Sequence, residues 1–197
     1  SWKSGPWQSL NRCPTVNLTC CRWRCADGIS RPTWPCPAIA NRPASSLPPP
    51  WQRLIRSLVI GETYFFRNRA YFDLLRSTIL PDITARQRAQ HDFKLNIWSA
   101  GCSTGEEAYS IAITVQELVG DLTRWNFRLV GTDMNRSALD TAERAIYRNW
   151  SFRHTDDAFQ KAYFTPLANA LQVNQAIRER VVFRQSNLLD GPPMPQC

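Results

Sequence analysis

From residue 95 onward, short runs of apolar residues alternate with segments whose apolar side chains recur every three or four positions. The runs at 95–100, 127–133 and 181–183 have the length and the dense apolar character of buried strands. Between the first two runs, residues 106–119 carry one apolar face and precede Gly120, which predicts a helix that ends there. Strands that alternate with helices predict an α/β fold with a mainly parallel sheet.

Helical spacing also recurs before the first strand, at 51–59 and at 70–79, and we expect Pro81 to end the second of these helices. After the second strand, Asn135 or Ser137 begins a further helix that we expect to include Ile146.

The stretch from Tyr163 to Val182 has the Thr, Val, Asn and Gln content of a hairpin. We expect it to form a small β-subdomain at about 160–182.

Residues 1–50 have a different character. They hold nine of the 14 prolines and four of the eight tryptophans, with no helical or strand periodicity. Such a segment has no clear apolar face whose burial would offset the ordering entropy, so we expect it to be disordered or the product of a shifted reading frame. It also holds five of the seven cysteines, but without the spacing of a zinc site or an even total for disulfides.

Charge and hydropathy exclude several functional classes. The net charge is +8, of which residues 1–50 supply +5, so the folded part gives little reason to expect nucleic acid as a partner. Nowhere does the chain approach the roughly 20 apolar residues of a membrane span, and its start lacks the apolar core of a signal peptide. We expect a monomeric, cytoplasmic protein without membrane insertion or bound metal.

The turn 101–105 joins the first strand to its helix and is the first candidate for ligand binding. It is neither a G-x-G-x-x-G fingerprint nor a phosphate-binding loop with a lysine. Glu106 and Glu107 at the helix start would repel a pyrophosphate, whereas a ligand with positive charge fits. S-adenosylmethionine carries a sulfonium and an ammonium group and no phosphate. Taken alone, however, the two glutamates are also explained as partners of Ser103 and Thr104 in capping boxes.

Asp133 ends the second strand, at the edge where α/β folds bind ligands. A carboxylate at that place accepts hydrogen bonds from ribose hydroxyls. Equally, Asp133 is explained as a residue that starts a turn or caps the next helix.

Four blocks of sequence together resemble one known family. They are GETYFFRN at 61–68, IWSAGCSTGEEAYSIA at 97–112, VGTDMN at 130–135 and VVFRQSNLLDG at 181–191. In order and spacing they are similar to the chemotaxis receptor methyltransferases, which are CheR-type protein-glutamate O-methyltransferases. The resemblance runs from about Trp51 to the end of the chain.

The resemblance implies a doubly wound α/β fold with a small β-subdomain and S-adenosyl-L-methionine as cofactor. It divides the chain into a helical lead-in at 51–94, which carries the ETYFFR motif, and a partial cofactor-binding domain at 95–197. It implies partners among the methyl-accepting chemotaxis receptors, through their acidic helical segments. By similarity, Arg67 is catalytic and also contacts the cofactor, and the other cofactor-binding residues are Thr63, Gly101, Glu106, Asp133, Asn187 and Leu188.

Two departures from the family leave alternatives open. Residues 1–50 do not resemble the family's basic helical domain, and the chain ends before a Cys-Arg-Asn-Val block that supplies further cofactor contacts. We therefore expect weak cofactor binding and poor turnover, and keep a cofactor- or receptor-binding module without turnover as the alternative. A methyltransferase of another class is disfavoured, because the Asn/Asp-Pro-Pro-aromatic signature of amino-methylating enzymes is absent.

Overall fold

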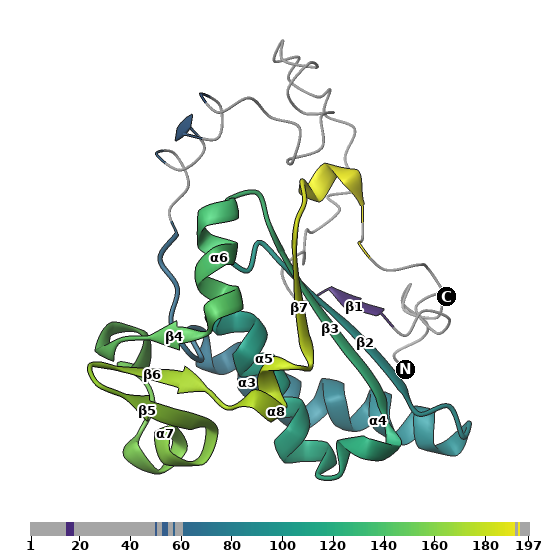
Figure 1. Cartoon of the computed structure of the whole chain (residues 1–197). Helices are drawn as coiled ribbons and strands as arrows, with labels where there is room; N and C mark the ends of the chain where they lie inside the picture. The colour runs from purple at the N-terminus through teal and green to yellow at the C-terminus, as the bar shows by residue number, and fades with distance from the viewer. Residues whose placement is uncertain are drawn as a thin grey trace, which may run out of the picture.

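The computed structural model describes residues 61–191 continuously, together with Thr15–Asn17 and the single positions 50, 53, 54, 57 and 193. It shows a parallel sheet with helices packed against it and a smaller sheet beside it (Figure 1). The predictions for residues 1–50 and for the helix at 51–59 lie mostly outside the described residues.

Strands and helices alternate along the described chain. In order, they are β1 (Thr15–Asn17), α3 (Arg69–Leu74), η3 (Leu75–Ile79), α4 (Leu80–Ala89), β2 (Lys94–Ala100), α5 (Glu106–Val119), η4 (Leu122–Arg124), β3 (Asn126–Asp133), α6 (Arg136–Arg144), β4 (Ile146–Tyr147), η5 (Asn149–Phe152), α7 (Asp157–Tyr163), β5 (Phe164–Leu167), β6 (Ala170–Val173), α8 (Gln175–Arg178), β7 (Val181–Gln185) and η6 (Leu188–Asp190).

The main sheet has the strand order β1-β2-β3-β7, and all its pairs are parallel. Ala100 pairs with Thr132, and Asp133 pairs with Gln185, so three strands end together at one edge. The three predicted strands are confirmed, and so is the α/β fold class. The shared edge collects the segments that follow each strand, as open α/β sheets do around their ligands.

Side chains of β2 and β3 alternate between the two faces of this sheet. On one face, Leu95, Ile97 and Leu129 join the main core with residues of α5 and α6. On the other face, Trp98 packs with Val130 in a separate buried cluster, and its indole Nε1 donates a hydrogen bond to Thr132 Oγ1 at 2.8 Å. Apolar side chains buried on both faces are typical of a parallel sheet that is covered on both sides.

The smaller sheet is antiparallel, with the order β4-β6-β5. Its β5–β6 hairpin confirms the hairpin predicted after Tyr163. The prediction that helix α6 includes Ile146 is wrong, because the helix ends at Arg144 and Ala145 turns the chain with a φ of 55°. Ile146 and Tyr147 then pair with β6 and attach the small sheet directly to the end of α6.

The prediction that Pro81 ends a helix is also wrong. The helix runs from Arg69 to Ala89 and contains a π-helical turn, η3, just before the proline. Proline lacks an N–H, and its ring collides with the carbonyl four residues back in a regular helix. The wider turn, in which the Leu80 N–H donates to the Leu75 carbonyl five residues back, allows the chain to continue through Pro81.

The turn from β2 into α5 is held by backbone contacts. The N–H groups of Gly101 and Cys102 donate to the Thr132 carbonyl at 2.7 and 2.9 Å. Gly105 is the N-cap of α5 and has no side chain to cap the helix, so the two expected capping boxes do not form. Its φ of 95° and the closeness of Ala142 leave room only for glycine there.

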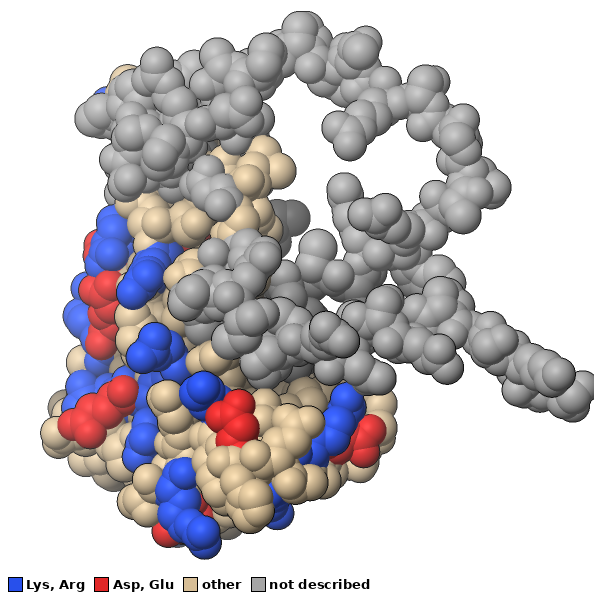
Figure 2. Space-filling model, turned by 90° about the vertical axis from the view of Figure 1, so that its right-hand side faces the viewer, with Lys and Arg blue, Asp and Glu red and all other residues tan. Residues whose placement is uncertain are grey.

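On the face shown in Figure 2, basic and acidic side chains lie interspersed over the described surface. No helix among the residues that the structure describes is long and apolar enough to cross a membrane.

Replacing Gly105 tests how tightly this turn is packed. A Cβ at Gly105 lies 2.7 Å from the Ala142 Cβ, whereas a Cβ at Gly120 meets nothing within 4 Å; both positions have positive φ. Gly105→Ala is expected to lower the free energy of unfolding by about 3 kcal/mol, and the control Gly120→Ala by about 1 kcal/mol. Urea denaturation followed by circular dichroism measures both, and equal losses would contradict the packing argument.

Candidate functional site

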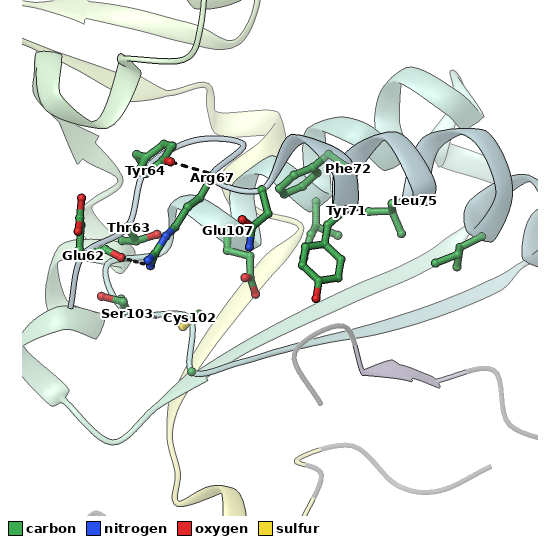
Figure 3. Close-up of a pocket in the computed structure, with 14 residues that line it drawn as sticks. Glu62, Thr63, Tyr64, Arg67, Tyr71, Phe72, Leu75, Cys102, Ser103 and Glu107 are labelled. Atoms are coloured by element: carbon green, nitrogen blue, oxygen red, sulfur yellow. Dashed lines mark hydrogen bonds between the residues drawn. The ribbon is translucent and has the colours of Figure 1, made fainter. Parts of the chain in front are cut away.

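A cavity of about 300 Å³ opens beside the carboxyl end of β2, between the loop at 61–68, the helix α3–η3 and the start of α5 (Figure 3). Its volume is at the lower end of the range for small-molecule sites. It is lined by Glu62, Thr63, Tyr64, Arg67, Asn68, Tyr71, Phe72, Leu75, Ile79, Gly101, Cys102, Ser103, Glu107 and Ile111.

The cavity has a polar end and an apolar end. Arg67 and Glu107 contribute opposite charges to the polar end, near the turn after β2, and Tyr71, Leu75 and Ile79 extend the apolar wall along α3 and η3 (Figure 3). Leu75 and Ile79 are the first and last residues of the π-helical turn. The distortion that Pro81 imposes therefore shapes one wall of the cavity, and such turns are frequent at functional sites.

The loop that carries Arg67 is anchored in the core. Phe65 is completely buried, with its ring centroid 5.0 Å from that of Tyr147, and the Phe65 N–H donates to the Ser151 carbonyl at 3.0 Å. The Phe66 N–H donates to Ser110 Oγ at 3.1 Å. Phe65 thus anchors the loop of the motif in the core.

Arg67 and Glu107 face the same space without pairing to each other. Arg67 Nη1 donates to the backbone carbonyl of Glu62, and Glu107 Oε1 accepts from Ser99 Oγ at 2.6 Å. Burial raises the pKa of the Glu107 carboxyl, while the Ser99 hydrogen bond and the charge of Arg67 act in the opposite direction. Among the ion pairs of the described residues, none joins Arg67 to Glu107.

Glu106, which the resemblance places among the cofactor-binding residues, does not line this cavity. Its side chain is 3% exposed; Oε1 accepts from Ser151 Oγ at 2.8 Å, and Oε2 accepts from Thr104 Oγ1 at 2.6 Å. Successive helix positions point about 100° apart, so only one of two adjacent glutamates faces a given space. Glu107 lies one turn before Ile111, which also lines the cavity, and that spacing was the signal in the sequence.

Asp133 lies behind the cavity wall. Its Oδ2 accepts from the Ser103 N–H at 2.9 Å and its Oδ1 from the Asn135 N–H at 2.8 Å. Ser103 lines the cavity, so Asp133 positions part of its wall. The side chain that caps α6 is that of Asn135, so Asp133 is not needed as the cap. Each carboxylate oxygen of Asp133 accepts one N–H and has a second lone pair that can accept a further donor.

Asn187 and Leu188 follow β7 at the same edge of the sheet but do not line the cavity. The link to Asp133 is direct, because the Ser186 N–H donates to the Asp133 carbonyl at 3.1 Å. Asn187 is buried and its Oδ1 accepts from the Leu189 N–H at 3.1 Å, whereas Leu188 is half exposed.

Of the seven predicted site residues, Thr63, Arg67 and Gly101 line the cavity. The sequence reasoning missed Glu107, Ser103 and the apolar wall. Cys102 also lines the cavity, but burial raises the pKa of its thiol well above the usual value, so the thiol stays protonated. Cys102 therefore fills space in the cavity wall and does not serve as a nucleophile.

Comparison with known proteins connects this site to a family. Residues 61–197 match the family described as CheR methyltransferase, SAM binding domain. The chain is 34% identical over 140 residues to a chemotaxis protein methyltransferase of Borreliella burgdorferi, covering 70% of this chain and 49% of that protein.

Two further relatives give the same picture. Identity is 35% over 144 residues to chemotaxis protein methyltransferase 2 of Pseudomonas aeruginosa, which covers 71% of this chain and 49% of that protein. The protein of the same name in Vibrio cholerae is 30% identical over 138 residues, with 70% and 47% covered. The chain thus spans about half the length of the curated relatives it matches.

The two neighbouring glutamates are expected to respond differently to truncation. Glu106→Ala leaves the buried hydroxyl of Ser151 and the partly buried hydroxyl of Thr104 without an acceptor and opens a cavity, so it is expected to lower the free energy of unfolding by about 3 kcal/mol. Glu107→Ala removes the acceptor of one buried hydroxyl, that of Ser99, but its side chain borders the cavity, so it is expected to cost less, about 1–2 kcal/mol. Thermal unfolding of both variants checks which one loses more stability. A larger loss in Glu107→Ala would show that Glu107, and not Glu106, is the structural anchor.

Proposed function

The chain belongs to the CheR methyltransferase family, and from that premise we propose that it methylates glutamate side chains of chemotaxis receptors. The cofactor of the family domain is S-adenosylmethionine. The product is a methyl ester, and the partners are receptor segments that present glutamates on helices. The curated relatives are named as chemotaxis protein methyltransferases, which supports this choice of partner.

One observation carries the proposal: Arg67 and Glu107 face one cavity with opposite charges and do not neutralise each other. An amino-acid group has a carboxylate and an ammonium group a few ångströms apart, so it satisfies both side chains at once. A phosphate ligand fits poorly, because Glu107 stands where its charge would lie. The donor set thus suits the methionine part of the cofactor.

The other end of the cofactor belongs at the shared strand edge. Asp133 would hold the ribose hydroxyls through its remaining lone pairs, and Asn187 with Leu188 would lie against the adenine. Glu107 takes the place beside the methionine part that the sequence reasoning gave to Glu106. Thr63 and Gly101 complete the wall between them.

Bound S-adenosylmethionine supplies an electrophilic methyl group on a positively charged sulfur. The substrate glutamate is ionised at neutral pH and needs no general base, since its pKa is about 4.3. Arg67 orients a carboxylate in the cavity, either that of the substrate or that of the cofactor. Leu75 and Ile79 give the cavity an apolar wall, and apolar surroundings favour a reaction in which opposite charges disappear.

Titration with S-adenosylmethionine tests the sugar contact. If Asp133 accepts ribose hydrogen bonds, Asp133→Ala is expected to cost about 1.5–3 kcal/mol, or about 10- to 100-fold in affinity. Asp140→Ala is the matched control, because Asp140 lies on the exposed side of α6, where it pairs with Arg136, and it does not line the cavity. Isothermal titration calorimetry measures all three proteins, and unchanged affinity in the Asp133 variant would refute the assignment.

The pH dependence of binding tests Glu107. An ammonium group bound against Glu107 stabilises the ionised carboxylate, so binding at low pH releases the proton that this carboxyl carries. Affinity is therefore expected to fall as the pH drops through the raised pKa of Glu107, at a higher pH than an ordinary glutamate would give. In Glu107→Gln, binding is expected to be weak and nearly independent of pH between about 5 and 7. A wild-type affinity that stays constant over this range would contradict the proposed contact.

Transfer of the methyl group is tested with labelled cofactor and a purified receptor fragment. We expect base-labile label on the receptor, and none on a fragment in which the accepting glutamates are glutamines. Cofactor or receptor binding without transfer would instead support the alternative of a binding module without turnover.

A further inference from the structure

Arg153 lies just after η5, on the segment that connects strands β4 and β5 of the small sheet, and it contacts the loop of the ETYFFR motif. Its Nη2 donates to Glu62 Oε1 at 2.8 Å. Its guanidinium carbon lies 3.5 Å from the ring centroid of Tyr64 and 4.1 Å from that of Trp150. Only 24% of the Arg153 side chain is exposed, whereas Trp150 is 64% exposed.

The geometry requires a guanidinium group. A planar cation stacks on aromatic rings with its faces while its edge donates hydrogen bonds in the plane. The Tyr64 ring also stacks on His154, with centroids 4.9 Å apart. Tyr64 is therefore held by two residues of the segment between β4 and β5.

Glu62 connects this cluster to the cavity. Its carboxylate accepts from Arg153, and its backbone carbonyl accepts from Nη1 of Arg67. Fixing Glu62 thus fixes the acceptor that orients the Arg67 guanidinium opposite Glu107. Arg153 does not line the cavity itself, so any effect on the ligand passes through the loop.

The loop has further anchors at Gly61, Phe65 and Phe66, the last through its N–H and Ser110 Oγ, and none of these contacts is made by Glu62 or Arg67. Ser103 Oγ donates to the Gly61 carbonyl at 3.1 Å, and the Phe65 N–H donates to the Ser151 carbonyl. Arg153 holds Glu62 from outside the loop, and it shares the contact to Tyr64 with His154.

One atom of Arg153 is left without a hydrogen bond: Nη1 is buried and has no acceptor within the described part of the chain. A buried donor without an acceptor costs stability. Stability alone therefore explains poorly why an arginine occupies this position. The contacts of Arg153 to Glu62 and Tyr64 explain it better.

We propose that Arg153 is a positioning residue, which holds Arg67 at the cavity by way of Glu62 and couples the small sheet to the binding site. This inference rests on the proposed function, because Arg67 is taken to contact the cofactor.

The test compares Arg153→Met, which keeps the stem of the side chain, with Arg148→Met, an exposed arginine of the same segment. Arg153→Met is expected to weaken S-adenosylmethionine binding about tenfold, because a displaced Arg67 loses its aligned contact. The Arg148 variant is expected to bind as the wild type does. Equal affinities of the two variants would overturn the proposal.

A double variant separates positioning from a general loss of stability. If Arg153 acts only through Arg67, Arg67→Met with Arg153→Met binds within about twofold of Arg67→Met alone. Two independent effects would multiply, and that result would overturn the proposal.

Hydrogen exchange gives a readout that needs no cofactor. Amide exchange in residues 61–68 is expected to be faster in Arg153→Met than in Arg148→Met. If the wild type fails to bind S-adenosylmethionine, the proposed function is refuted. The claim that Arg153 holds the loop is then decided by this exchange alone, and unchanged exchange refutes it too.

Discussion

The carbonyl of Thr132 accepts the N–H groups of both Gly101 and Cys102, and this double contact ties the end of β2 to β3. The rest of the site depends on it. Because the turn starts at a fixed place on β3, the Ser103 N–H reaches Asp133 and the Ser103 hydroxyl reaches the Gly61 carbonyl. One turn thereby joins the sheet edge to the loop that carries Arg67.

The two adjacent glutamates at the start of α5 have different surroundings and different roles. Glu106 points inward and accepts hydrogen bonds from Ser151 and Thr104, which connects the helix to the segment between strands β4 and β5 of the small sheet. Glu107 points into the cavity, where burial raises its pKa and makes a cationic group a favourable neighbour. Of two adjacent glutamates, one thus anchors the helix and the other lines the cavity.

The small antiparallel sheet is connected to the cavity through β4, β5 and the segment between them. Phe65 packs against Tyr147, Phe152 and Phe164, and Ser151 and Arg153 bond the same loop by its backbone and by Glu62. The loop therefore has the main sheet on one side and the small sheet on the other. Its cavity-lining residues are placed by contacts from both.

Local periodicity determined most of the fold: the three buried strands, the helix α5 with its end at Gly120 and the hairpin after Tyr163 follow from patterns that neighbouring residues set. It failed at Pro81 and at Ile146. In both cases, interactions beyond the neighbouring residues determine where the helix ends. A π-helical turn accommodates Pro81 within the helix, and pairing with β6 places Ile146 in a strand. Motif order in the sequence was enough to identify the family and to name Thr63, Arg67 and Gly101. Only the tertiary structure decided which glutamate faces the cavity and that Arg153 reaches Glu62, because helix phase and contacts 91 residues apart arise when the elements pack.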